Sequence, residues 1–333
     1  MTKSVDHGPD IDPISLAIVI PVFDDWNSLF LLLPLLDRSL EGKGLITELM
    51  VVDDGSLVSY EESDFEFRSY RNIDRITLIQ LKRNLGHQRA IALGLAVASV
   101  ERQCDAVVVM DGDGEDDPSE AMRLINRCRE ESFKKIVFGN RAIRSEGIVF
   151  RFFYSIYRLF YKILTGKPIR VGNFSVVPRT ALNRLLVVSE VWNHYAAAIL
   201  KARLPYTEVN TRRGSRLSGK PKMNFVSLVI HGLSAISVHG DAVGVRLLIG
   251  TSIVMVLSFV GILIVFLIRL VTDLAIPGWA TYATAMLLII LMQALTLSLF
   301  FIFLVLNNRD NASFIPERDY QQFISDIRDI TVR

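Results

Sequence analysis

The chain has 333 residues, of which 50% are hydrophobic and 22% charged, with a formal net charge of +2 and a mean hydropathy of +0.34. This balance is too apolar for an ordinary soluble enzyme and too charged for a protein that lies wholly within a membrane, so we expect a mixed architecture. The sequence has no basic stripe with interleaved aromatic residues, which argues against nucleic acid as a partner, and its two cysteines, Cys104 and Cys128, lack metal-site spacing.

Short β-branched runs alternate with helical patterns from Leu16 to Val177. This alternation predicts an α/β fold with a doubly wound, mainly parallel sheet. The expected strands are LAIVIPV, ELMVVDD, ITLIQL, AVVVMD, KIVFGN and FSVVP, and the expected helices cover Asp25 to Ser39, His87 to Ser99 and Pro118 to Arg129. Ligands bind beyond the carboxyl ends of the strands in such sheets, and the motifs PVFDD, VDDGS, RNLGHQ and DGDGEDD fall there.

An acidic loop, DGDGEDD, follows the fourth expected strand. Asp111, Asp113 and Glu115 alternate along it, and alternating carboxylates on a glycine-bearing loop can direct oxygens at one hard cation, Mg²⁺ or Mn²⁺. Such an ion also binds a substrate diphosphate. The alternative is a solvated acidic turn that caps the helix beginning at Pro118.

Two further segments suit a membrane surface. RFFYSIYRLFYKIL combines aromatic bodies with basic side chains, which favours a helix in the membrane interface over a core helix. NTRRGSRLSGKPKMNF gathers guanidinium and ammonium groups on a glycine-bearing loop. We expect this loop to bind phosphate, and the alternative is a basic flap attracted to anionic lipid.

Two uncharged runs, Leu247 to Ile268 and Leu274 to Asn308, are each long enough to cross a bilayer. The N-terminal segment lacks the apolar run of a secretory signal, and Arg246 and Arg309 flank the two spans, so we expect both termini in the cytoplasm. The expected organisation is a cytoplasmic catalytic domain over 1–224, an interfacial helix over 225–245, spans over 246–270 and 279–306 joined by a loop over 271–278, and a cytoplasmic tail over 307–333.

The motifs IPVFDD, VVDDGS, RNLGHQRAIALGLA and MDGDGEDDP together resemble the inverting glycosyltransferase family 2 domain, whose fold is GT-A and whose metal motif is DxD. The resemblance covers Ile18 to about Lys222. With the two spans, the chain is similar to dolichol-phosphate mannose synthase and the bacterial polyprenyl-phosphate glycosyltransferases. This implies transfer of one sugar from a UDP- or GDP-sugar to a polyprenyl phosphate, at the cytoplasmic face of a bacterial inner membrane, in the synthesis of cell-envelope glycans. It also implies that the membrane helices can mediate self-association.

The resemblance further implies roles for individual residues. The donor would be bound by Pro21, Phe23, Asp25, Asp53, Asp54, Asn84, Gly86, Asp111 and Gly112. The metal would be bound by Asp111, Asp113 and Glu115, with Glu115 where relatives often carry Gln, and phosphate by Arg141, Arg213, Arg216 and Lys222. The family's R-x-x-G-x-S-K element is matched by Arg216, Gly219, Pro221 and Lys222, with Pro221 in place of Ser. The residues expected nearest the chemistry are Asp113, Asn173 and Glu190.

One departure from the family bears on the acceptor. Relatives carry a GDFR-type element where this chain has GNFS, so the family's Asp is Asn173. An amide cannot abstract a proton, but a lipid phosphate is already ionised and needs no strong base. A hydroxyl acceptor on a lipid-linked glycan or glycolipid would need one, and Glu190 and His194 are the candidates. A non-catalytic scaffold is the remaining alternative, and the intact acidic triad argues against it.

Overall fold

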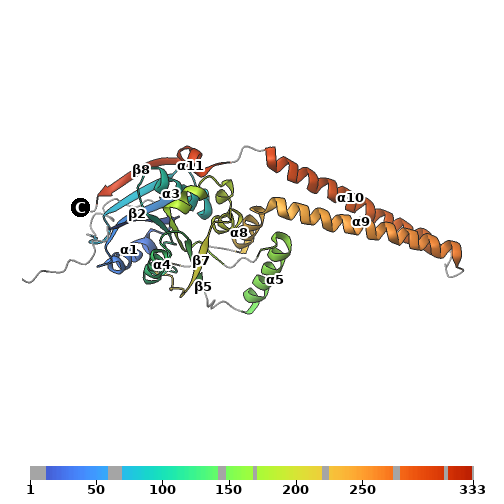
Figure 1. Ribbon diagram of the computed structural model, residues 1–333, viewed down its shortest axis with the longest axis horizontal. Helices are drawn as coiled ribbons and strands as arrows, with labels where there is room; N and C mark the ends of the chain where they lie inside the picture. The colour runs from blue at the N-terminus through green and yellow to red at the C-terminus, as the bar shows by residue number, and fades with distance from the viewer. Residues whose placement is uncertain are drawn as a thin grey trace, which may run out of the picture. The chain divides into compact units, whose positions relative to one another are not determined.

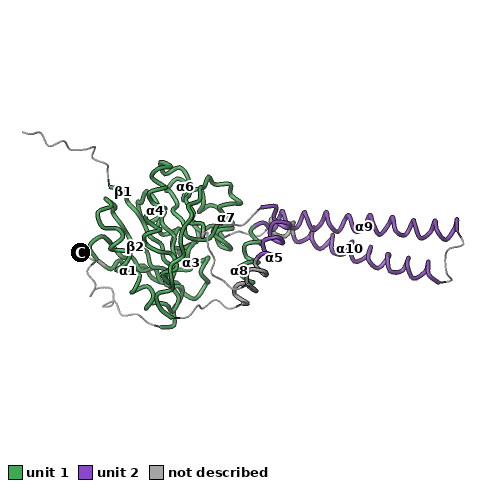
Figure 2. Tube along the Cα trace, turned by 90° about the horizontal axis from the view of Figure 1, so that it is seen from below, with its two compact units in different colours: residues 1–147, 170–238, 314–333 green, residues 148–169, 239–313 purple. Residues whose placement is uncertain are grey.

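The computed structural model describes residues 13–58, 70–141, 148–167, 171–219, 225–272, 278–310 and 314–331. The chain divides into two compact units, coloured separately in Figure 2. Unit 1 comprises Met1–Gly147, Arg170–Val238 and Phe314–Arg333, and unit 2 comprises Ile148–Ile169 and His239–Ser313. Residues 148–169 fall within the catalytic domain expected over 1–224 but belong to unit 2, and residues 314–333 belong to unit 1.

Unit 1 is built on an eight-stranded sheet of order β7-β5-β6-β4-β1-β2-β3-β8. Its strands are β1 (Ile14–Val22), β2 (Leu45–Asp53), β3 (Arg75–Leu81), β4 (Ala106–Val109), β5 (Ile136–Arg141), β6 (Ser175–Pro178), β7 (Tyr206–Thr211) and β8 (Ile324–Thr331). β1 pairs in parallel with β2 and β4, β2 with β3, and β5 with β7, whereas β6 is antiparallel to β4 and β5. The mainly parallel sheet is confirmed, but FSVVP runs the other way, because a short, fully buried apolar run carries no signal of direction.

Helices cover both faces of this sheet (Figure 1), which explains why β1 is continuously apolar from Leu16 to Val22 rather than at alternate residues. Ile18 and Ile20 belong to one buried apolar cluster with residues of α1 (Trp26–Leu40) and α4 (Pro118–Glu130). Ala17 and Val19 belong to another, with residues of α3 (His87–Val100), α6 (Arg179–Leu185) and α7 (Tyr195–Lys201). The remaining elements of unit 1 are α8 (Phe225–Ser237), α11 (Pro316–Asp319) and the short 3₁₀ helices η1 (Ser189–Trp192) and η2 (Tyr320–Gln322). The three helices expected in this region are confirmed.

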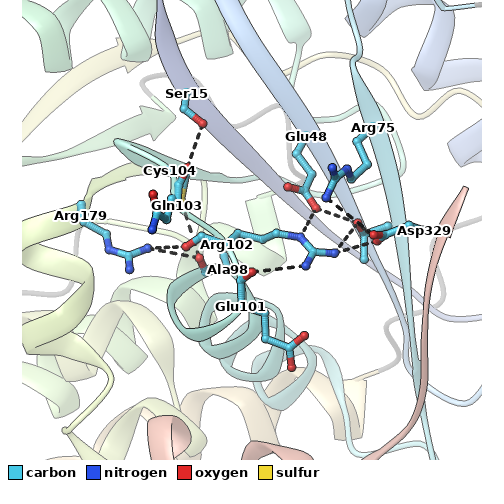
Figure 3. Close-up of polar contacts among 11 residues, drawn as sticks. Ser15, Glu48, Arg75, Ala98, Glu101, Arg102, Gln103, Cys104, Arg179 and Asp329 are labelled. Atoms are coloured by element: carbon cyan, nitrogen blue, oxygen red, sulfur yellow. Dashed lines mark hydrogen bonds and ion pairs between the residues drawn. The ribbon is translucent and has the colours of Figure 1, made fainter. Parts of the chain in front are cut away.

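The end of the chain adds β8 to the sheet beside β3, antiparallel to it. Figure 3 shows Arg102 reaching two strands, with Nε 2.7 Å from Glu48 Oε1 and Nη2 2.7 Å from Asp329 Oδ1. Thr77 Oγ1 lies 2.7 Å from the same Glu48 oxygen and 2.8 Å from the same Asp329 oxygen. Within the tail expected over 307–333, the segment ISDIRDIT therefore contributes an edge strand to the sheet, held by these polar contacts.

Unit 2 consists of α5 (Ile148–Thr165), α9 (Gly240–Val271) and α10 (Trp279–Asp310). α9 and α10 are long and apolar enough to cross a membrane, and they contain the two expected spans. They pack against each other, and Thr251 Oγ1 lies 2.7 Å from Ser298 Oγ at their contact. α5 packs on α9, where Arg246 Nη1 donates to the Ile163 carbonyl at 2.6 Å.

Candidate active site

The loops after β1 and β2 are fastened together by side chains that bind backbone amides. Asp24 has a positive φ of 49°, and its Oδ1 accepts from the amides of Leu57 at 2.7 Å and Val58 at 2.9 Å. Its own amide donates to Ser56 Oγ at 2.9 Å, and the Ser56 amide donates to Asp53 Oδ1 at 2.9 Å. Each of these bonds satisfies the hydrogen-bonding need of a backbone amide and of its oxygen partner, so the loops after β1 and β2 are held together as one structural unit, called the frame below.

Asp54 fastens the loop after β3 to the same frame. Its two oxygens accept from the amides of Leu85 at 2.7 Å and Gly86 at 2.9 Å, and only 3% of the residue is exposed. Burial raises the pKa of this carboxyl above its ordinary value, although the two amide bonds act in the opposite direction. Gly55 is required here, since a Cβ would lie 2.6 Å from the backbone nitrogen of Asn84 in a conformation with φ of +70°. The Asp54 carboxylate, expected at the donor, is thus occupied by the loop that carries Asn84 and Gly86.

The first loop also presents side chains outward. Pro21 lies within β1, Phe23 is 36% exposed, and Asp25 precedes α1. Asp25 accepts a hydrogen bond from Ser28 Oγ at 2.8 Å and forms an ion pair with Arg216. Gly112 packs closely behind this loop, since a Cβ there would lie 3.0 Å from Ile20. The predicted donor residues of the first and fourth loops are therefore neighbours.

The acidic loop and the basic loop, far apart in sequence, lie side by side. The Gly214 amide donates to the Glu115 carbonyl at 2.8 Å, and the Leu217 amide donates to the Asp113 carbonyl at 2.9 Å. Asp116 and Arg213 form a further antiparallel backbone bridge. The backbone thus fixes the two loops against each other without using their charged side chains.

Those charged side chains then pair across the two loops. Arg213 forms an ion pair with Glu115, and Arg216 Nη1 lies 2.9 Å from Asp113 Oδ2 while its other terminal nitrogen pairs with Asp25. Arg216 also donates from Nε to the Ser218 carbonyl at 2.8 Å, and only 15% of its side chain is exposed. Two of the predicted phosphate-binding residues therefore meet two of the predicted metal ligands.

Asp111, Asp113 and Glu115 carry the oxygen ligands that a hard divalent cation prefers, but their carboxylates do not surround a common metal position. Over the described ranges, no three His, Cys, Asp or Glu side chains form a group that could hold a metal ion. Burial raises the pKa of Asp113, as do the negative charges of Asp111 and Glu115, while the Glu115 amide and Arg216 lower it. This crowding of negative charge is what a bound cation relieves, so Asp111 and Asp113 are the residues that would hold one. Capping of α4 does not explain the triad, because Asp117 caps it by accepting from the Ser119 amide at 2.7 Å.

His87, which the sequence motifs did not identify as a site residue, lies beside Asp111. Val109 in β4 is opposite Ser175 in the antiparallel β6, so Asn173 lies next to the acidic loop. His87 Nε2 lies 3.3 Å from Asp111 Oδ1 and 3.1 Å from Asn173 Nδ2. Burial lowers the pKa of His87, but the negative charges of Asp111, Asp116 and Asp54 act in the opposite direction, and the pKa is raised overall. The motif RNLGHQ contains His87, and its place at the start of a helix after a strand was the available signal.

The two candidate bases are engaged elsewhere. Glu190 Oε1 lies 2.6 Å from Lys201 Nζ, and although burial raises its pKa, the bonds from Lys201 and Ser189 lower it overall. His194 Nδ1 accepts from the Ala197 amide at 3.3 Å and so caps α7. Burial and the neighbouring His231 lower the pKa of His194 to about 3. Both side chains thus have structural partners of their own.

Two predicted phosphate-binding positions are not tested by this geometry. Lys222 lies outside the described residues. Arg141 ends β5, where its backbone pairs with Thr211, but its side chain is outside the described part of the chain. Both remain predictions.

Comparison with known proteins shows which family the chain resembles. Residues 17–189, more than half of the chain, match the family model described as Glycosyl transferase family 2. An uncharacterized glycosyltransferase of Bacillus subtilis, YkcC, is 26% identical over 288 residues, which cover 83% of this chain and 84% of the relative. The undecaprenyl-phosphate 4-deoxy-4-formamido-L-arabinose transferase of Salmonella paratyphi B is 26% identical over 228 residues, 66% of each chain.

A solved structure agrees on the fold. Glucosyl-3-phosphoglycerate synthase from Mycobacterium tuberculosis, in complex with Mn²⁺, uridine-diphosphate-glucose and phosphoglyceric acid, matches with a TM-score of 0.50. The match covers 72% of this chain and 86% of that chain at 15% sequence identity. Together with the mixed eight-stranded sheet, this similarity identifies the fold as GT-A-like.

Proposed function

We propose a donor and an acceptor for this chain, which belongs to glycosyl transferase family 2 and is a glycosyltransferase. It moves one sugar, with inversion, from a UDP- or GDP-sugar to a polyprenyl phosphate at the cytoplasmic face of a bacterial inner membrane. The observation that carries this proposal is the pairing of the acidic loop with the basic loop at the carboxyl end of the sheet. Such an arrangement supplies both signs of charge that a nucleoside diphosphate and its cation require.

The donor side of the proposal assigns roles to both loops. Arg213 and Arg216 bind the diphosphate oxygens, because a guanidinium gives two parallel hydrogen bonds to phosphate as it does to carboxylate. Asp111 and Asp113 hold Mg²⁺ or Mn²⁺, which when bound neutralises the charge that collects on the leaving diphosphate. Phe23 and Asp25 contact the nucleoside, and the exposure of Phe23 and the ion pair of Asp25 with Arg216 support these roles. The M. tuberculosis structure, crystallised with Mn²⁺ and a UDP-sugar, supports this kind of donor.

The acceptor side needs no strong base. An ionised phosphate oxygen attacks the anomeric carbon, the bond to the diphosphate breaks, and the electron pair leaves with the nucleoside diphosphate. Attack opposite the leaving group inverts the anomeric centre, and no proton has to be removed. The engagement of Glu190 by Lys201 and of His194 by Ala197 supports a phosphate over a hydroxyl. The similarity to the undecaprenyl-phosphate 4-deoxy-4-formamido-L-arabinose transferase of Salmonella supports undecaprenyl phosphate as the chemical class of the acceptor.

The membrane placement rests on unit 2. α9 and α10 pass the length and composition test for membrane spans. In α5, Leu159, Phe160 and Ile163 are each more than half exposed although they are large and apolar. Apolar side chains beside Lys162 suit the boundary between headgroups and acyl chains. This placement gives the enzyme access to a lipid-linked phosphate without a pore.

Incubation with labelled UDP- or GDP-sugar, Mn²⁺ and undecaprenyl phosphate tests the proposal. It predicts a labelled product that enters the organic phase and is released by mild acid, as a sugar phosphate ester is. Asp113→Asn is the matched negative control. Failure of all UDP and GDP donors with the purified full chain in detergent would contradict the proposal.

A further inference from the structure

The side-chain amide of Gln88, the second residue of α3, has a fixed orientation. Gln88 is only 9% exposed, and its Oε1 accepts from the backbone amide of Tyr195 at 2.8 Å. A backbone N–H can only donate, so the atom that faces it has to be the oxygen. The Nε2 group of Gln88 consequently points the other way as a donor.

This orientation determines the next amide. Gln88 Nε2 lies 3.2 Å from Asn173 Oδ1. Because Nε2 can only donate, the Asn173 atom facing it is the oxygen, and Asn173 therefore presents its Nδ2 donors on the side of His87 and Asp111. A backbone N–H of α7 thus sets which end of Asn173 faces the acidic loop.

The backbone of Asn173 is held as well. Ser175 Oγ donates to the Asn173 carbonyl at 2.8 Å and lies 2.7 Å from the Tyr195 hydroxyl. Ser175 and Tyr195 are fully buried. Tyr195 therefore supports Asn173 from two directions, through its hydroxyl to Ser175 and through its amide to Gln88.

We propose that Gln88 is a positioning residue that fixes Asn173 as a hydrogen-bond donor toward the acceptor, and that this selects an acceptor whose attacking oxygen is already anionic. The inference rests on the proposed function and deepens it at the acceptor side. An N–H donor stabilises a phosphate oxygen and offers nothing that takes a proton from a hydroxyl. A phosphomonoester on a polyprenyl chain meets this requirement, and the corresponding polyprenol does not.

The test is a double-mutant cycle on acceptor kinetics, with undecaprenyl phosphate as the probe. Gln88→Glu keeps an acceptor for the Tyr195 amide but places an oxygen against Asn173 Oδ1, so the Asn173 amide turns over. We expect the KM for undecaprenyl phosphate to rise about ten- to a hundredfold, the range for losing a hydrogen bond to a charged group. Gln88→Met, which removes the donor without adding charge, is expected to raise the same KM by less. Affinity for UDP or GDP should stay within about twofold of wild type.

The cycle separates positioning from a general structural role. In an Asn173→Ala background, Gln88→Met should change the acceptor KM by less than about twofold, because its target is gone. Additive effects, or an equal loss of nucleotide affinity, would overturn the inference. Gln103→Glu, an exposed glutamine just before β4, is the matched control for added charge and should leave both constants unchanged.

A second measurement separates this inference from the proposed function. Wild-type enzyme is offered undecaprenyl phosphate and undecaprenol in parallel, and we expect product only from the phosphate. Product from the alcohol would overturn both the acceptor assignment and the inference, as would absence of both products. Use of the phosphate together with an additive cycle would overturn the inference alone.

Discussion

Two sets of carboxylates at one edge of the sheet are satisfied in different ways. Asp24 and Asp54 accept hydrogen bonds from backbone amides of neighbouring loops, and Asp53 accepts one from the Ser56 amide of its own loop. Asp113 and Glu115, in the loop after β4, pair with arginine side chains of the basic loop, and Asp113 also accepts from the Glu115 amide of its own loop at 2.9 Å. The first set lies at the ends of β1 and β2, and the second lies beyond β4.

This difference separates carboxylates that hold the loops in place from carboxylates that we expect to take part in donor binding. A backbone amide cannot leave its partner without moving the chain, whereas an arginine can exchange a carboxylate for a phosphate by rotating its side chain. We therefore expect substitutions in the amide-bound set to affect stability, and substitutions in the arginine-paired set to affect donor binding and turnover.

The largest effect is expected at Asp113. Asp113→Asn removes one charge from the acidic loop while keeping the size of the side chain, and we expect transfer to fall by about a hundredfold or more. The thermal midpoint in detergent should stay close to wild type, because Arg216 keeps its bonds to Asp25 and Ser218. Product formation and thermal unfolding measured on the same preparation check this. A large loss of stability would show that Asp113 has a structural role like that of Asp24, Asp53 and Asp54.

Next in size is the loss of a guanidinium. Arg216→Gln should weaken nucleoside diphosphate binding about ten- to a hundredfold, the range for one charge-assisted hydrogen bond. Arg213→Gln should cost less, since 29% of the Arg213 side chain is exposed against 15% for Arg216. Calorimetric titration measures both. Arg212→Gln, an exposed neighbour in the same loop, is the matched control, and equal losses in all three variants would contradict a specific role.

The frame is tested at Asp54. Asp54→Ala leaves the buried Leu85 amide and the half-buried Gly86 amide without their carboxylate, and the cost is about 1–3 kcal/mol for a buried unsatisfied group. We expect a clear fall in the thermal midpoint, with Asp54→Asn milder because its amide oxygen still accepts one bond. If the Asp54→Ala variant keeps its stability but loses nucleotide affinity, Asp54 has a role in donor binding and its assignment to the frame is wrong.

The smallest effect concerns pH. The folded-state pKa of His194 is about 3, below its ordinary value of 6.5, because the imidazole is buried and lies near the charge of His231. A depressed pKa contributes stability that is present above pH 6.5 and is lost as pH falls toward 3, by up to about 1.4 kcal/mol per pH unit. His194→Asn caps the helix without titrating, so its thermal midpoint should fall less between pH 7 and pH 5 than that of wild type. Equal slopes would contradict this.

Much of the fold was predictable, because apolar runs and capping residues are local signals. β1, α3 and α4 lie within a residue or two of their expected bounds. The direction of β6 was not predictable from four buried residues, and β8 was missed because ISDIRDIT is half polar and finds its place only by pairing with β3.

The site was predictable only in part, for a related reason. The motifs identified the loops but not their partners. That Arg216 meets Asp25 and Asp113, or that Gln88 orients Asn173, depends on long-range pairing between segments that no local pattern records.

The central claim is that the acidic and basic loops together hold the diphosphate of a nucleotide-sugar donor. The most direct measurement is a calorimetric titration of UDP and GDP, with and without Mn²⁺, against wild type, Asp113→Asn and Arg216→Gln. The account predicts that one nucleotide binds in a Mn²⁺-dependent manner, and that each substitution weakens its binding by about tenfold or more. Absence of binding by both nucleotides, or binding that neither substitution changes, would contradict it.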